Sequence, residues 1–173
     1  MSRGLFIGRF QPFHKGHYLA LKDILSREDE VIIAIGSTQD SYTLENPLTA
    51  GERLEMIYHL LKIEGWLDRA YIVQVPDAHE YAVWPGRVIA YSPKFDRVYS
   101  GNEVVLMLFE RFGYPTVRIP HYKRDLYKGE EIRRRIIAGE PWEHLVPEPI
   151  LEKLKEFNFV ERILRLAKKS GDE

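Results

Sequence analysis

Cysteine is absent from the sequence, and this absence excludes several kinds of site at once. Without a thiol, the chain forms no disulfide scaffold, no thiolate nucleophile and no Cys-ligated zinc site. Long apolar runs are absent as well, since the longest, such as VIIAI at 31–35, fall far below the roughly 20 residues of a membrane-spanning helix. The first eight residues carry no apolar segment of the kind found in a secretory signal. We therefore expect a cytoplasmic protein that has no membrane partner.

The sequence also lacks an excess of positive charge. Lys and Arg number 25 against 26 Asp and Glu, which gives a net charge of −1. Proteins that coat DNA or RNA are usually basic, so we expect no nucleic-acid partner, although a local basic pocket for one phosphorylated ligand remains open. Asn and Gln are scarce, and abundant Glu, Lys and Arg complete a composition that resembles that of thermophile proteins.

Short apolar runs alternate with amphipathic segments along most of the chain. This alternation predicts an α/β fold with a Rossmann-like, doubly wound parallel sheet of about five strands. At 173 residues, we expect one domain, with an α/β core at 1–122 and a mostly helical part at 123–173. The strands that we expect are 5–8, 31–36, 71–75, 95–100 and 116–120.

One helix has a clear start signal. Thr49 and Glu52 match the S/T-x-x-E capping box, in which each side chain accepts a backbone N–H from the other residue. We expect the helix that follows to bury Leu54, Ile57 and Leu61.

The stretch GRFQPFHKGH, residues 8–17, joins the first expected strand to the first expected helix. Ligands of doubly wound sheets bind at such carboxyl ends of strands. The sequence has neither a P-loop nor a G-x-G-x-x-G fingerprint, so phosphate would have to be bound in another way. Gly8 permits close approach to the backbone, Arg9 supplies a permanently charged forked donor, and Pro12 turns the chain. A helix N-terminus near His17 favours anions.

The spacing H-x-G-H directs the imidazoles of His14 and His17 toward one point, if the first lies in the turn and the second in the first helical turn. Gly16 between them leaves room for a phosphate oxygen. Two imidazoles, an arginine and a helix dipole are suited to bind a polyphosphate. They are particularly suited to stabilise the negative charge that builds up during phosphoryl-group chemistry. Two other interpretations stay open. The histidines could merely cap the helix or pack under a loop, or they could bind a metal, although no convincing carboxylate lies nearby.

This stretch resembles the H-x-G-H motif of the nucleotidylyltransferase superfamily, and more narrowly the archaeal-type nicotinamide mononucleotide (NMN) adenylyltransferases. Similar blocks follow in the same order at 35–53, 95–102 and 122–136, so the resemblance spans nearly the whole chain. It implies transfer of AMP from ATP to NMN, giving NAD and pyrophosphate, with Mg²⁺ arriving on ATP and no protein-bound metal site. It also implies a homo-oligomer, since relatives often form hexamers.

The segment 122–136 holds six Lys or Arg residues and three acidic residues. Three consecutive arginines point about 100° apart on a helix, so we expect two of them to lie on a solvated face with intrahelical ion pairs. In the family, an arginine that follows isoleucine binds the ATP phosphates, and Arg133 matches it. Lys128, Gly129 and Glu130 stand where serine or threonine is common, so the hydroxyl contacts of the family are missing here.

A second substrate needs its own residues. The resemblance implies that Trp84 stacks on the nicotinamide ring, which suits a flat cation on an indole face, and Asp77 is a polar candidate nearby. A packing tryptophan at a helix start is the alternative. Ser100, Gly101 and Asn102 lie at the carboxyl end of an expected strand and suit a ribose or base. His59, His79, His121 and His144 show no partner pattern and are assigned nothing.

The NMN phosphate is already ionised at neutral pH, so the implied reaction needs alignment and charge neutralisation and no catalytic base. The catalytic residues that we expect are Arg9, His14, His17 and Arg133. The ATP-binding residues that we expect are Gly8, Arg9, Phe10, Gln11, His14, His17, Ser100, Gly101, Asn102, Lys128, Gly129 and Arg133. The alternatives are an adenylyl- or cytidylyltransferase for another phosphate acceptor, and a nucleotide- or RNA-binding module without chemistry.

Overall fold

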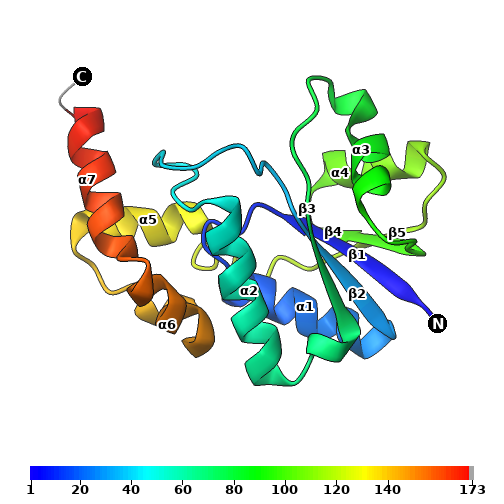
Figure 1. The fold of residues 1–173 in the computed structure, drawn as a ribbon, viewed down its shortest axis with the longest axis horizontal. Helices are drawn as coiled ribbons and strands as arrows, with labels where there is room; N and C mark the ends of the chain where they lie inside the picture. Colours follow the sequence, from blue (N-terminus) through cyan, green and yellow to red (C-terminus); the bar gives the residue numbers. More distant parts are fainter. Residues whose placement is uncertain (172–173) are drawn as a thin grey trace.

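The computed structural model describes residues 1–171, which form a five-stranded parallel sheet covered by helices on both faces (Figure 1). The strand order is β3-β2-β1-β4-β5, so the direction of winding reverses between β1 and β4. This is the doubly wound α/β fold that the sequence predicts. The strands are β1 (Arg3–Gly8), β2 (Glu30–Ile35), β3 (Ala70–Gln74), β4 (Arg97–Ser100) and β5 (Thr116–Arg118).

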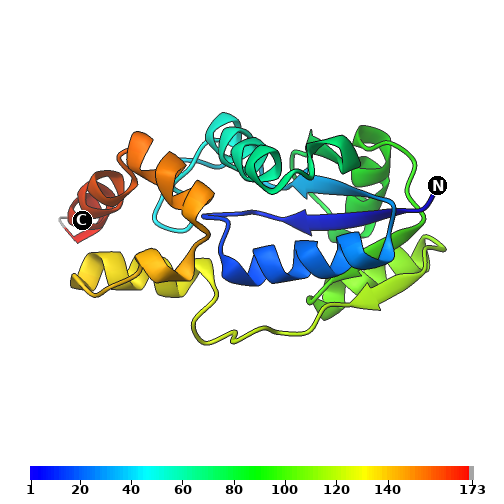
Figure 2. The same cartoon turned by 90° about the horizontal axis from the view of Figure 1, so that it is seen from below.

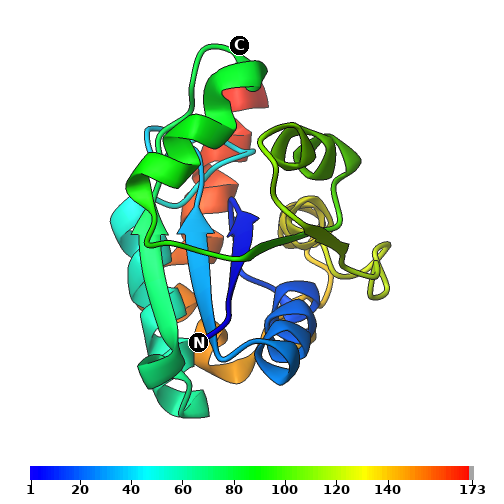
Figure 3. The same ribbon diagram turned by 90° about the vertical axis from the view of Figure 1, so that its right-hand side faces the viewer.

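The helices divide between the two faces because alternate side chains of each strand point to opposite sides. On one face, Phe6 and Ile33 pack with α1 (Lys15–Arg27) and α2 (Ala50–Glu64). On the other face, Leu5 and Ile32 pack with residues of α3 (Trp84–Tyr91) and α4 (Glu103–Arg111). The two layers stand on either side of the sheet in Figure 3.

The five expected strands are all present, with ends that differ by one to two residues. β4 begins at Arg97 instead of residue 95, and β5 ends at Arg118 instead of residue 120. Strand ends depend on pairing with neighbours, and β4 and β5 pair over three positions each with their inner neighbours, which periodicity alone cannot show.

Helix α2 confirms one expectation and overturns another. The capping box is present, because Thr49 Oγ1 accepts the N–H of Glu52 at 3.0 Å and Glu52 Oε1 accepts the N–H of Thr49 at 3.0 Å. The expected burial of Leu54 is wrong: its side chain is 36% exposed, while the neighbouring Arg53 is fully buried. The buried stripe of the helix begins at Arg53 because this side chain reaches backbone carbonyls that need donors.

The C-terminal segment packs beside α2 at one end of the molecule (Figures 1 and 2). It consists of α5 (Gly129–Ala138), α6 (Glu148–Glu156) and α7 (Phe159–Gly171), with a short 3-10 turn at Glu143–Leu145 between α5 and α6. Its apolar residues, such as Ile132 and Phe159, belong to the same core cluster as α1 and α2. None of the helices within residues 1–171 combines the length and apolar character that crossing a bilayer requires.

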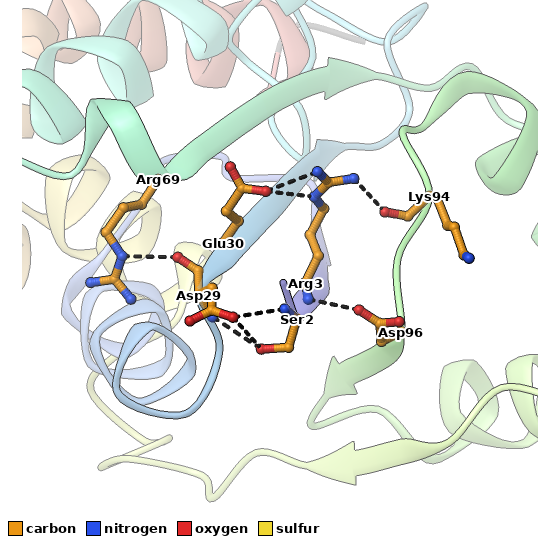
Figure 4. A network of polar contacts seen from close by, with 7 residues as sticks. All are labelled: Ser2, Arg3, Asp29, Glu30, Arg69, Lys94 and Asp96. Carbon is orange, nitrogen blue, oxygen red and sulfur yellow. Dashed lines mark hydrogen bonds and ion pairs between the residues drawn. The ribbon is translucent and has the colours of Figure 1, made fainter.

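A network of polar contacts lies at the amino ends of the strands (Figure 4). Arg3 donates to Glu30 Oε1 at 2.8 Å and to the carbonyl of Lys94 at 2.6 Å. Arg69 donates to the carbonyls of Asp29, Leu25 and Glu28. These contacts hold the amino ends of the strands, which leaves the carboxyl ends free to form a site.

Candidate active site

A cavity of about 610 Å³ lies at the carboxyl ends of β1 and β4, where the strand order reverses. The sequence predicts a ligand site at this edge, and the cavity brings together residues from distant parts of the chain. The expected site residues that line it are His14, His17, Ser100, Gly101, Asn102 and Lys128, together with Gly16.

His14 and His17 cap the first helix with their own rings. Nδ1 of His14 accepts the N–H of Gly16 at 3.0 Å and the N–H of His17 at 3.4 Å. Nδ1 of His17 accepts the N–H of His14 at 3.1 Å. The two rings stack with their centroids 3.6 Å apart. The capping role, which the sequence offers as an alternative, is therefore present in addition to the position in the cavity.

This arrangement fixes the protonation of both rings. A nitrogen that accepts a backbone N–H carries no proton, so the proton of each neutral ring is on Nε2. Burial lowers the pKa of His14 to about 3, and burial together with the neighbouring His14 lowers the pKa of His17 well below its usual value. Both histidines are consequently neutral N–H donors and not cations at neutral pH.

An aromatic wall holds His17 in position. The rings of Phe10 and Phe13 lie 4.8 and 5.2 Å from the His17 ring. Phe10 is 1% exposed, and Gln11 exchanges two hydrogen bonds with the backbone of Leu48. The structure thus directs the side chains of Phe10 and Gln11 into the protein, so only their backbone atoms remain available to a ligand.

Arg133 approaches the same loop from α5. Its Nη1 donates to the carbonyl of Gln11 at 2.7 Å, and burial lowers the pKa of its guanidinium. Gly129 makes this approach feasible, because a Cβ there would lie 2.7 Å from Arg133 Nη1 and 2.9 Å from the Gln11 oxygen. Arg134 and Arg135 both pair with Glu131, which confirms that two of the three arginines form intrahelical ion pairs.

Arg9 is exposed at the end of β1. Burial lowers the pKa values of Arg133 and of the buried Arg53, and repulsion from Arg9 adds to this effect. Lys128 precedes α5 and lines the cavity. Carboxylates offset part of this positive charge, since Glu130 and Glu45 favour the charged form of Arg133 while Asp40 and Asp77 favour that of Arg53.

Trp84 and Asp77 do not line this cavity. Trp84 is the first residue of α3, half-buried, with its ring edge-on to Phe109 at 5.7 Å. The Asp77 carboxylate accepts hydrogen bonds from Ser37 Oγ at 3.0 Å and Gln39 Nε2 at 2.9 Å. Asp77 therefore ties the loop after β3 to the loop after β2, a role that the sequence does not suggest.

Several cavity residues are absent from the sequence prediction. His121, which follows β5, lies against Gly101, where a Cβ would come within 3.1 Å of its ring. Arg124 Nη1 lies 3.3 Å from His121 Nε2, and Arg118 pairs with Glu103 across the cavity mouth. The sequence contains one signal for His121, namely its position just after an expected strand. No motif partner accompanies His121, so the sequence alone does not identify it as a site residue.

The site contains few groups that could bind a metal ion. Within residues 1–171, no three His, Asp or Glu side chains converge in the way that a protein-held ion requires. The chemistry of the lining is instead that of an anion site, with imidazole and guanidinium donors.

The chain matches one protein-family model, described as cytidylyltransferase-like, over residues 5–135. Among curated proteins, the nicotinamide-nucleotide adenylyltransferase of Pyrococcus horikoshii is 50% identical over 167 residues, covering 96% of this chain and 90% of that protein. The nicotinamide-nucleotide adenylyltransferase of Methanosarcina mazei is 44% identical over 163 residues, covering 94% and 93% of the two chains.

Solved structures share the fold. A bifunctional NMN adenylyltransferase/ADP ribose pyrophosphatase from Francisella tularensis, complexed with AMP and a Mn ion, aligns with a TM-score of 0.80 at 23% identity. The alignment covers 98% of this chain and 53% of that one, so the present chain spans about half of the bifunctional protein.

Proposed function

The chain belongs to the cytidylyltransferase-like family, and we propose on that premise that it is a nicotinamide-nucleotide adenylyltransferase. It transfers AMP from ATP to NMN and releases pyrophosphate. The observation that carries this conclusion is the cavity at the β1/β4 switch point, lined by two neutral N–H donors, in a chain 50% identical to relatives named for this activity.

The chemistry suits such a site because no proton has to be removed. An oxygen of the ionised NMN phosphate attacks the α-phosphorus of ATP in line with the bond to the β-phosphate. The new bond joins the two nucleotides, and the broken bond releases pyrophosphate with its negative charge. The protein must align the two phosphates and stabilise charge on the α-phosphate and the leaving group.

We assign the donors accordingly. His17 Nε2–H donates to the α-phosphate, while His14 and Arg133 hold the β- and γ-phosphates. Arg9 and Lys128 add positive charge, and Ser100, Gly101 and Asn102 hold the nucleoside. Gly8, Phe10, Gln11 and Gly129 contribute through their backbone, which fits the inward direction of the Phe10 and Gln11 side chains.

For the second substrate, we assign Trp84 as the stacking partner of the nicotinamide ring and Asp77 as a polar contact. Trp84 is half-buried at the start of α3, and its ring packs against Phe109. This position supports the assignment, because part of the indole ring stays available for stacking on the nicotinamide ring. Asp77 accepts hydrogen bonds from Ser37 and Gln39, and these bonds support its assignment because they hold its carboxylate in a fixed position beside that subsite.

Mg²⁺ would arrive on the triphosphate of ATP and neutralise part of its charge, since the described side chains form no metal site of their own. We propose further that the protein acts in the cytoplasm and as a homo-oligomer, a hexamer being the expected form. Light scattering coupled to size-exclusion chromatography tests the assembly.

The test of the function is incubation with ATP, Mg²⁺ and NMN, followed by measurement of NAD and pyrophosphate. Equal amounts of both products support the proposal. Pyrophosphate release only with another phosphate acceptor, such as pantetheine phosphate, flavin mononucleotide or glycerol phosphate, would assign the chain to a different transferase. RNA binding without pyrophosphate from any acceptor would favour a binding module. Nicotinic acid mononucleotide as a parallel substrate defines the base preference.

A further inference from the structure

Among the residues that the structure describes, Arg53 is the largest fully buried side chain, at 0% exposure. It lies in the first turn of α2, behind the stretch 8–17, here named the phosphate loop. All four of its side-chain hydrogen bonds go to backbone carbonyls. Nη1 donates to Arg9 at 2.9 Å and to Gly36 at 2.7 Å. Nη2 donates to Ser37 at 3.1 Å, and Nε donates to Thr49 at 3.2 Å.

These carbonyls belong to three separate segments. Arg9 follows β1 and lies in the phosphate loop, while Gly36 and Ser37 follow β2 and begin the loop that Asp77 joins. Thr49 caps α2. One guanidinium therefore connects the loop that carries the two histidines with the loop beside Asp77.

The loop after β1 and the loop after β2 each contain a residue with an unfavourable backbone conformation. Phe10 has φ of 54° and Ser37 has φ of 49°, both in the left-handed region that side chains other than glycine and asparagine disfavour. Arg53 binds the carbonyl immediately before Phe10 and the carbonyl of Ser37 itself. Such strained turns persist only where surrounding contacts hold them, and Arg53 supplies those contacts from below.

The position of Arg53 also bears on charge. Burial lowers the pKa of the guanidinium to about 10, while Asp40 and Asp77 favour its charged form and Arg9 opposes it. Arg53 is consequently charged at neutral pH and adds positive potential beneath a loop that binds anions.

We propose that Arg53 is a positioning residue that fixes the phosphate loop relative to the loop that begins at Gly36 and Ser37, and so holds the ATP subsite in register with the NMN subsite. The inference rests on the proposed function, because that function assigns ATP to the phosphate loop and NMN to Asp77, which Ser37 binds. Arg53 touches neither substrate, since it is wholly buried. A displacement of about 1 Å at a reacting centre can cost about 10²-fold in rate, which is the scale expected here.

Arg69 provides a matched control. It also donates to three backbone carbonyls, at 2.6 to 2.9 Å, but at the opposite end of the sheet (Figure 4). The experiment compares Arg53→Lys with Arg69→Lys, each of which keeps the charge and loses the planar fork. The measurements are the thermal midpoint, kcat and the KM of each substrate. Amide hydrogen exchange of segments 9–11 and 36–38 supplies a readout independent of activity.

The expected result is a loss of about 10²-fold in kcat/KM for both ATP and NMN in Arg53→Lys, with faster exchange in both segments. Arg69→Lys should lose thermal stability while its kcat/KM stays within about threefold of wild type. If the two variants show equal kcat/KM at equal loss of thermal midpoint, Arg53 is merely structural and the proposal is wrong.

Arg53→Met removes the charge as well and should lose more activity than Arg53→Lys. Should Arg53→Met fail to fold, the comparison of the two lysine variants still decides the question. An inactive wild-type protein would contradict the proposed function itself, and the hydrogen-exchange comparison would then still show whether Arg53 couples the two loops.

Discussion

The imidazole rings of His14 and His17 cap each other's backbone N–H through Nδ1, with the rings stacked 3.6 Å apart. In an ordinary capping box these roles fall to Ser or Thr and to Glu or Gln. Here the reciprocal bonds occupy the inner nitrogen of each ring and leave the outer N–H for a ligand. The same pair of residues thus starts the helix and supplies two donors of fixed tautomer.

Replacing His17 by asparagine separates these two roles. The Asn side-chain oxygen can accept the N–H of His14, but the variant lacks a donor at the Nε2 position. We expect kcat to fall by about 10²–10³-fold, the usual cost of losing one oxyanion donor, with a thermal midpoint close to wild type. His17→Ala, which removes cap and donor together, should lose stability as well. Near-normal turnover of His17→Asn with saturating substrates would contradict the assigned role.

The buried histidines should make stability depend on pH. In the unfolded chain a histidine has a pKa near 6.5, whereas in the folded protein burial lowers the pKa of His14 to about 3 and that of His17 in the same direction. Between these values the unfolded state binds more protons, so acidification favours unfolding. The free energy of unfolding should fall by about 1.4 kcal/mol per pH unit for each histidine as the pH drops below 6.5.

Urea unfolding between pH 7 and 5 measures this dependence. The range stays above the pKa of ordinary carboxylates, so that the histidines dominate the slope. A double variant, His14→Asn with His17→Asn, should show a shallower slope than wild type. An unchanged slope would mean that these rings are not the groups that take up the protons.

Gly16 should not tolerate a side chain. A Cβ there would lie 2.9 Å from Cε1 of His14 and 3.2 Å from Cβ of Tyr127, so Gly16→Ala must displace the His14 ring. We expect a lower kcat/KM together with a lower thermal midpoint. Gly51→Ala is the control, because its Cβ would meet only Thr49 Oγ1 at 3.9 Å in the first turn of α2. That change should raise stability by up to about 1 kcal/mol and leave activity unchanged.

Arg133 and its neighbour Arg134 allow a test of the phosphate-binding role within one helix turn. Arg133→Lys removes the fork that donates to the Gln11 carbonyl and faces the loop, so the KM of ATP should rise and kcat should fall. Arg134→Lys alters an exposed pair with Glu131 and Glu140, so both kinetic constants should stay at the wild-type level. Equal effects of the two changes on kcat/KM would exclude a specific role for Arg133.

Glu28 should matter for stability and not for catalysis. Its side chain is almost fully buried at the amino end of the sheet and accepts from Arg97 at 2.8 Å and Tyr99 at 2.7 Å. Glu28→Gln should lower the free energy of unfolding by about 1–3 kcal/mol, because the Arg97 charge loses its partner. Asp23→Asn, in a surface pair with Arg27, should change it by only about 0.5 kcal/mol. Kinetic constants should stay unchanged in both variants.

The sequence predicts the sheet and the location of the cavity well, because both follow from local patterns. Apolar runs and caps locate the strands and helices, and the loop after the first strand must reach the carboxyl edge of a parallel sheet. Helix geometry alone also predicts that Arg133 points in a different direction from Arg134 and Arg135, which pair with Glu131. These features need no knowledge of distant contacts.

Arg53 and His121 show where sequence reasoning fails. A charged residue in an amphipathic helix is normally assigned to the solvent side. Arg53 is buried instead of Leu54 because it donates to the carbonyls of Arg9 and Gly36, which lie in two distant turns. His121 enters the cavity because β4 pairs with β1, two strands that are not consecutive along the chain, and this pairing brings the segment after β5 close to the histidine loop.

The hydrogen bond from Arg133 to the Gln11 carbonyl joins residues that are 122 positions apart. A ribosome making this chain exposes the histidine loop early and α5 late, so the phosphate-binding set is incomplete for most of synthesis. Premature release of a chain that ends before α5 would therefore yield a product with the histidines but without the arginine that completes the set. Under the proposed function, activity therefore requires that synthesis has passed α5 and that α5 has packed against the histidine loop.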